Sequence, residues 1–216
     1  MNINRLTLYS NNIAEQKAFY SDVLDFLVIE TTENSIDISI GDSTLCFIQS
    51  DHATPYHFAI NIPSNKEHEA LDWLKQRLEI LCYENDELID FPNWNAKAMY
   101  FYDADKNIVE FIARKNLNIN TSSPFSAEQC IEISEIGLSV INIEETYGSL
   151  NAIKPLPVYF GSFDMFCAAG DERGLFIIID KHKKLWFPSN DVAHTSDFSI
   201  EGDYNFRFIK GKVLPY

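Results

Sequence analysis

The sequence has few basic residues and no long apolar run, and each absence argues against a class of function. Asp and Glu outnumber Lys and Arg by 32 to 17, which gives a net charge of −15. Because nucleic-acid phosphates and anionic membranes repel such a surface, we expect the chain to bind neither. No segment approaches about 18 consecutive apolar residues, so no transmembrane helix is expected.

The cysteines are also few and form no motif. Four of them lie far apart and none belongs to a CxxC pattern, which argues against a zinc ribbon and a thioredoxin-type site. The N-terminal residues lack the basic start and apolar stretch of a signal peptide, so the sequence predicts a cytoplasmic protein. The sequence contains no glycine-rich phosphate loop, no HExxH motif and no signature of a catalytic Ser/His/Asp triad.

What is present is one order of elements, repeated within the first 115 residues. Residues 3–9 alternate as a strand does, residues 13–24 have a one-sided apolar helix pattern, and three short β-branched and aromatic runs follow. The order starts again with a strand over 56–62 and a helix over 64–78. Three further strands are expected in this second unit, over 80–86, 96–103 and 107–113.

The repeat weakens after this point. Residues 116–129 are polar and aperiodic, which is typical of a linker. Residues 130–143 form a long alternating strand, and 130–216 read as a third copy followed by an incomplete fourth. The sequence therefore predicts one domain over 1–115, a linker over 116–129 and a degenerate, incomplete domain over 130–216.

The segments YHFAINIP and MYFYDADKNIVEF resemble the second repeat of the vicinal oxygen chelate superfamily, which contains glyoxalases, bleomycin resistance proteins and extradiol dioxygenases. In that family a first strand carries a metal-binding His, and a metal-binding Glu follows an Asp-Pro-Asp-Gly-Asn-like turn. His57 and Glu110 occupy these positions. Three residues match the turn and two depart from it, namely Asp103, Asp105 and Asn107 against Ala104 and Lys106.

The resemblance implies a fold class and a set of site residues. The fold would be α+β, made of paired β-α-β-β-β modules with curled sheets, followed by a degenerate partial second pair. The four metal-ligand positions would be Arg5, Cys46, His57 and Glu110. A guanidinium cannot ligate a cation, so Arg5 breaks this set. His57 and Glu110 remain as ligands, and Cys46 is a tentative third that is otherwise read as a core residue.

An alternative site contains no metal. Arg5 would then pair with the carboxylate of Glu110 beside His57, and the three residues would bind a polar or anionic small molecule. Tyr100, Tyr102 and Trp94 are expected near this cleft and could stack on a planar ligand. Glu135 takes the place of His57 in the third copy and is interpreted as a solvated strand residue rather than part of a second pocket.

Two functions follow from these alternatives. The preferred one is a small-molecule-binding protein of the glyoxalase and bleomycin-resistance type, without a complete metal site, because Arg5 interrupts the ligand set. The other is a metal-dependent lyase or dioxygenase that acts on a small oxygenated substrate, with one zinc, nickel, manganese or iron ion and Glu110 as the catalytic residue. A homodimer is left open, since a second chain could complete the unfinished fourth copy.

Overall fold

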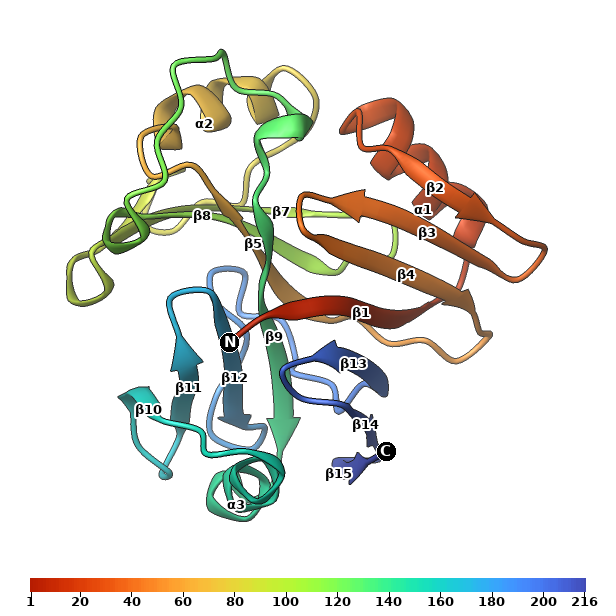
Figure 1. Cartoon of the computed structure of the whole chain (residues 1–216), viewed down its shortest axis with the longest axis vertical. Coiled ribbons are helices and arrows are strands. Elements are labelled where there is room, and N and C mark those ends of the chain that lie inside the picture. Colours follow the sequence, from red (N-terminus) through yellow and green to blue (C-terminus); the bar gives the residue numbers. More distant parts are fainter.

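The computed structural model describes residues 1–216, and its strands form two curled sheets (Figure 1). Four structural units follow one another along the chain. The first three are β-α-β-β-β, and the fourth consists of strands alone. This is the α+β architecture of curled sheets that the resemblance implies.

The bounds of the elements follow this division into units. The first unit contains β1 (Ile3–Ser10), α1 (Ile13–Ala18), β2 (Val28–Thr31), β3 (Ser35–Ile40) and β4 (Ser43–Gln49). The second contains β5 (His57–Ile62), α2 (Glu67–Lys75), β6 (Ile89–Phe91), β7 (Ala96–Tyr102) and β8 (Ile108–Arg114). The third contains β9 (Glu132–Val140), α3 (Ile143–Ile153), β10 (Val158–Gly161), β11 (Phe166–Asp171) and β12 (Gly174–Asp180). The fourth contains β13 (Phe198–Gly202), β14 (Phe206–Ile209) and β15 (Lys212–Pro215).

The units pair in a way that the repeat did not predict. Sheet A has the order β15-β14-β13-β1-β4-β3-β2 and joins the first unit to the fourth. Sheet B has the order β10-β11-β12-β9-β5-β8-β7-β6 and joins the second unit to the third. The first and second units therefore do not share a sheet. The first strand of every unit offers unpaired backbone groups, and local sequence does not specify which other first strand will satisfy them.

Side chains of sheet B alternate between two faces, as strand geometry requires. On β5, Phe58 and Ile60 join the main hydrophobic core. On the opposite face, Ala59 belongs to a smaller apolar cluster. His57 and Asn61 share the parity of Ala59 along the strand, and all three are buried. Because β5 is covered on both faces, polar side chains on the second face lie inside the protein.

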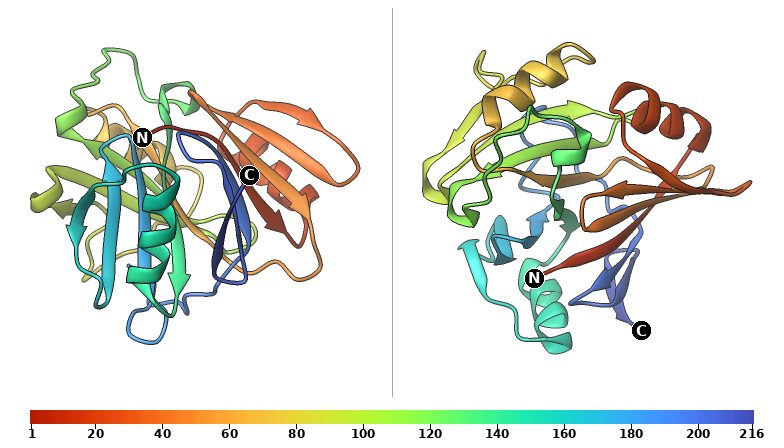
Figure 2. Two further views of the ribbon diagram at one scale, coloured as in Figure 1. Left: turned by 60° about the horizontal axis from the view of Figure 1, so that its bottom comes forward. Right: turned by 45° about the horizontal axis from the view of Figure 1, so that its top comes forward.

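The helices cover the main core. α1 contacts β3 and β4, α2 contacts β7 and β8, and α3 contacts β11, β12 and β15, as the further views show (Figure 2). Asn12 begins α1 and Asn142 begins α3, and each side-chain oxygen accepts a hydrogen bond from the backbone amide three residues later. This capping satisfies amides that have no partner within the helix.

Several local expectations differ from the structure. The second helix starts at Glu67 rather than at Ser64, because the Ser64 hydroxyl donates to the carbonyl of Arg114. The strand expected over 80–86 is reduced to isolated bridges, and its place beside β7 is taken by β6.

Residues 116–129 connect β8 to β9 and are partly packed. Phe125 is buried, and its ring lies 5.6 Å from that of Trp73. The division into domains over 1–115 and 130–216 with a linker between them remains a prediction, although both sheets combine strands from the two sides of residues 116–129. None of the helices has the length and apolarity that crossing a membrane requires.

The β3–β4 turn offers a test of how the two sheets meet. Gly41 has φ +53°, and a Cβ added there would lie 2.0 Å from the carbonyl oxygen of Ile131, just before β9. We expect Gly41→Ala to lower the free energy of unfolding by about 3 kcal/mol, through backbone strain and overpacking.

Gly148→Ala is the control, because nothing lies within 4 Å of that added Cβ in α3. It should raise stability by about 0.5–1 kcal/mol. Urea denaturation of both variants checks this, and equal effects would contradict it.

Candidate functional site

His57 stands at the start of β5 and is held in one protonation state. Its Nδ1 lies 3.2 Å from the carbonyl oxygen of Ile108. A carbonyl oxygen only accepts, so this partner assigns the ring proton to Nδ1 and leaves a lone pair on Nε2. Burial lowers the pKa of His57 to about 4, and the ring is therefore neutral near pH 7. A neutral imidazole with a free Nε2 is the form that binds metal ions.

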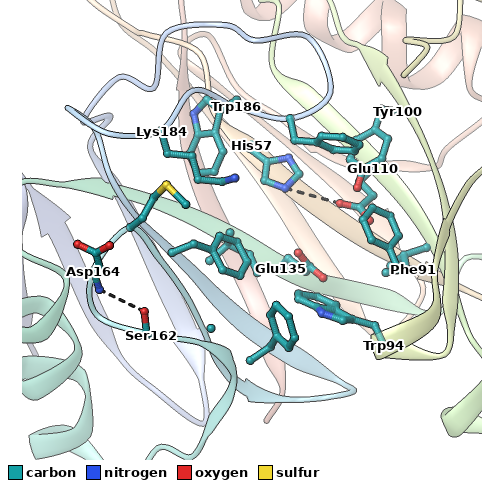
Figure 3. A pocket seen from close by; sticks show the side chains of 17 residues that line it. His57, Phe91, Trp94, Tyr100, Glu110, Glu135, Ser162, Asp164, Lys184 and Trp186 are labelled. Atoms are coloured by element: carbon teal, nitrogen blue, oxygen red, sulfur yellow. Dashed lines mark hydrogen bonds and ion pairs between the residues drawn. The ribbon is translucent and has the colours of Figure 1, made fainter. Parts of the chain in front are cut away.

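Glu110 faces this lone pair from the neighbouring strand. β8 runs parallel to β5 with Glu110 beside Ala59, and the Oε2 atom of Glu110 lies 3.6 Å from Nε2 of His57 (Figure 3). The register is fixed by the β7–β8 turn, where the Asp103 carboxylate accepts hydrogen bonds from the amides of Asp105 and Asn107. The predicted turn thus places the carboxylate beside the imidazole.

Glu135 completes the cluster from β9. Antiparallel pairing sets Glu135 against Ala59, and one ligand atom each of His57, Glu110 and Glu135 lies within 4.8 Å of the others. All three side chains are buried. Burial raises the pKa of Glu110 well above its ordinary value, and the neighbouring Glu135 raises it further. Burial also raises the pKa of Glu135 to about 7, against the opposing effect of Arg114.

Arg114 is a buried cation next to this cluster. Its guanidinium forms an ion pair with Glu135, and its Nε donates to Oδ1 of Asn61 at 3.3 Å. Nη1 lies 3.7 Å from Oε2 of Glu172, and neither atom has a hydrogen-bond partner. Arg114 therefore neutralises one of the two cluster carboxylates and leaves the other without a cation.

The donor groups of the cluster are of the kinds that bind divalent cations. One neutral imidazole and two carboxylates are ligands for ions such as manganese, iron and zinc, and three protein ligands leave positions open for substrate oxygens. The strand register identifies a fourth equivalent position. Leu175 lies beside Glu135 as Ile108 lies beside His57, so Ile177 corresponds to Glu110. Ile177 cannot ligate, and the set ends at three.

A cavity of about 480 Å³ opens beside the cluster (Figure 3). Seven of its 17 lining residues are Phe, Tyr or Trp, and the walls of this aromatic cavity come from both units of sheet B and from the segment after β12. Trp186 lies across the His57 ring with 5.2 Å between ring centroids, and Gly137 leaves the space it occupies, since an added Cβ there would lie 2.5 Å from the indole. This size and lining are typical of small-molecule sites.

Two of the three aromatic residues expected near the cleft line the cavity, and the third does not. Trp94 and Tyr100 line this cavity, and Tyr100 lies directly opposite Glu110 in the β7–β8 pairing. Tyr102 does not line it. Its hydroxyl donates to Asp191 at 2.6 Å, and its ring borders a separate pocket.

Arg5 and Cys46 lie on sheet A, outside the cluster. Arg5 forms a bidentate ion pair with Asp37, at 2.7 and 2.8 Å, so the expected contact between Arg5 and Glu110 is not formed. Burial and a hydrogen bond with Asp37 together raise the pKa of the Cys46 thiol to about 11. Both residues were assigned to the site on the premise that the first and second units share a sheet, and the observed pairing removes that premise.

Glu135 is the cluster residue whose surroundings the sequence mispredicts. The sequence does carry its signal, because Glu135 stands where His57 stands in an earlier copy of the repeat. It was interpreted as solvated, whereas the β5–β9 pairing buries it beside His57. Arg114 and Trp186 carry no comparable signal, since each reaches the site through tertiary packing.

The fold is similar to that of solved dioxygenase-type and glyoxalase proteins. A Bacillus subtilis protein provisionally named a dioxygenase matches 83% of this chain and 63% of its own, with a TM-score of 0.62 and 14% identity. Glyoxalase I from Zea mays matches 82% of this chain and 66% of its own, with a TM-score of 0.55 and 12% identity. The chain thus spans slightly less than two thirds of either protein. No protein-family model and no curated protein matches the sequence.

The pKa of His57 makes stability depend on pH. Between about 4 and the ordinary value of 6.5, the folded protein binds fewer protons at this ring than the unfolded chain, so stability falls as pH falls. In chelator-treated protein, we expect wild type to lose about 2 kcal/mol more than His57→Gln between about pH 7.5 and pH 5. Urea denaturation at the two pH values measures this. Parallel losses in both proteins would show that the ring titrates normally.

Proposed function

We propose that the chain binds one divalent cation through His57, Glu110 and Glu135 and acts on a small oxygenated molecule in the adjoining aromatic cavity. The convergence of the three donors within 4.8 Å is the observation that carries this proposal. The sequence favoured a metal-free protein because Arg5 interrupted the ligand set. Glu135 is part of the cluster and Arg5 pairs with Asp37 on the other sheet, so Arg5 does not interrupt the ligand set.

The protein's own residues would prepare the site for such chemistry. A bound divalent cation would act as a Lewis acid on a carbonyl or hydroxyl oxygen of the substrate. His57 is fixed by the Ile108 carbonyl, so its Nε2 needs no reorientation to bind. Burial and Glu135 raise the pKa of Glu110 in the ion-free protein, so its carboxylate would release a proton on binding the cation. The apolar walls would exclude water from the reacting groups.

A metal-free binding protein is the second candidate, and one observation favours it. The ion pair between Arg114 and Glu135 supplies a positive charge that a cation would otherwise supply. In this version Arg114 takes the role that the sequence assigned to Arg5. The site would then bind a polar group of a ligand through His57 and Glu110 without any ion.

A cation titration separates the two candidates. We expect chelator-treated wild type to bind about one Mn²⁺ or Zn²⁺ per chain in calorimetry, and Glu110→Gln to weaken this binding at least about 100-fold, because a neutral amide replaces a charged ligand. Glu132→Gln is the matched control. Glu132 is a buried residue of the same strand as Glu135, but it pairs with Arg173 outside the cluster.

The control should retain affinity within about threefold, as expected for a residue that touches no ligand. Absence of binding by wild type for both ions would reject the metal-dependent proposal and leave the metal-free candidate. Equal weakening in Glu110→Gln and Glu132→Gln would place the ion elsewhere.

Two wider expectations belong to this proposal. A cytoplasmic location is consistent with the four cysteines, all of which are free thiols. A homodimer is proposed because the fourth unit, β13 to β15, lacks the helix of the others and leaves sheet A with a partial unit at one edge.

A further inference from the structure

The walls of the aromatic cavity are suited to a flat apolar body. Phe187 lies 6.0 Å from Phe91 and 5.5 Å from Tyr100, both in edge-on arrangements, and Trp94 lies 5.9 Å from Phe160 in the same manner. Rings held at these separations by one another form a rigid lining rather than a collapsed core. A planar ring system could pack against them without ordering the walls further.

One positively charged side chain, that of Lys184, reaches this lining from the segment after β12. The Lys184 amide donates to the carbonyl of Asp180 at 3.0 Å, and the Lys184 ammonium lies 5.5 Å above the ring of Phe166. Its amino group points into the hollow, across from Glu110 in the close view (Figure 3). The side chain is half-buried.

Lys184 has no acidic partner within the protein. Asp164 lines the same cavity and Asp180 lies four residues before Lys184, but both carboxylates contact the ammonium of Lys183 instead, at 2.7 and 3.7 Å. Lys184 itself forms no ion pair. A partly shielded cation without a counter-charge attracts an anion more strongly than a solvated one does.

The net charge of the whole chain opposes the binding of anions. At a net charge of −15 the protein repels anions in general, so an anionic ligand needs a local cation at the site. Lys184 provides it on the wall of the aromatic cavity. We infer that Lys184 is a specificity-determining residue and that the ligand is an aromatic organic anion, such as a carboxylate, rather than a neutral aromatic compound. This inference rests on the proposed function, because it names the substrate class of the same site.

Two probes of equal shape test this inference. 2-Naphthoate and 2-naphthamide share one ring system and differ in the charge of one substituent. Calorimetry on chelator-treated protein measures both affinities, so that no carboxylate–metal contact contributes. We expect wild type to bind naphthoate about tenfold more tightly than naphthamide, the effect of one charge-assisted contact. Lys184→Met keeps the alkyl stem and should remove this preference without changing the affinity for naphthamide.

Lys17→Met is the control, since Lys17 lies on α1, which packs against sheet A, and the substitution changes the net charge equally. It should keep the tenfold preference. Equal affinity of wild type for both probes, a preference that survives in Lys184→Met, or failure of both probes to bind would each overturn the inference. The cation titration reads the proposed metal site independently, so a failure here leaves that result standing and the reverse is equally true.

Discussion

The antiparallel pairing of β5 with β9 is the contact on which the candidate site depends. It sets Ala59 against Glu135 and thereby brings a carboxylate of the third unit beside the His57 and Glu110 of the second. Without this pairing each unit would hold at most two of the donors. The same contact brings the third unit and the segment after β12 beside the second unit. Together they supply four aromatic residues of the cavity, Phe160, Phe166, Trp186 and Phe187.

Electrostatics explains why this cluster is costly to build and what it favours. Two ionised carboxylates with oxygens within 4.8 Å repel each other by on the order of 3 kcal/mol at the effective dielectric of a protein site. Arg114 offsets one of them, whereas burial and Glu135 raise the pKa of the other, Glu110, and so favour its binding of a further positive charge. A neutral His57 adds no positive charge. The arrangement therefore retains an affinity for one more cation, whether a proton or a metal ion.

Local sequence was sufficient for most elements and for two of the three donors, His57 and Glu110. Alternation over 56–62 and the Asp103 turn predicted the strands of His57 and Glu110, and both features are short-range. Which two units share a sheet depends on contacts between first strands far apart in the sequence. The edges of these strands are equivalent, so the local sequence does not predict the pairing. This pairing explains why Arg5 was placed beside Glu110 and why Glu135 was read as solvated. The aromatic walls were predicted only in part, because Tyr102 forms a long-range hydrogen bond with Asp191 and borders another pocket.

The two sheets carry equivalent positions, and their chemistry explains why only one offers a site. By register, Arg5 corresponds to His57, and Cys46 corresponds to Glu110. On β13 Ser199 lies against Thr7 as Glu135 lies against Ala59. The sheet A set is therefore a guanidinium, a thiol whose pKa burial raises and a hydroxyl, and the guanidinium already pairs with Asp37. Its charges are satisfied internally, whereas in sheet B two buried carboxylates share one arginine. Because unsatisfied charge is what draws a ligand into a buried site, the asymmetry between the sheets favours sheet B as the place of the candidate site.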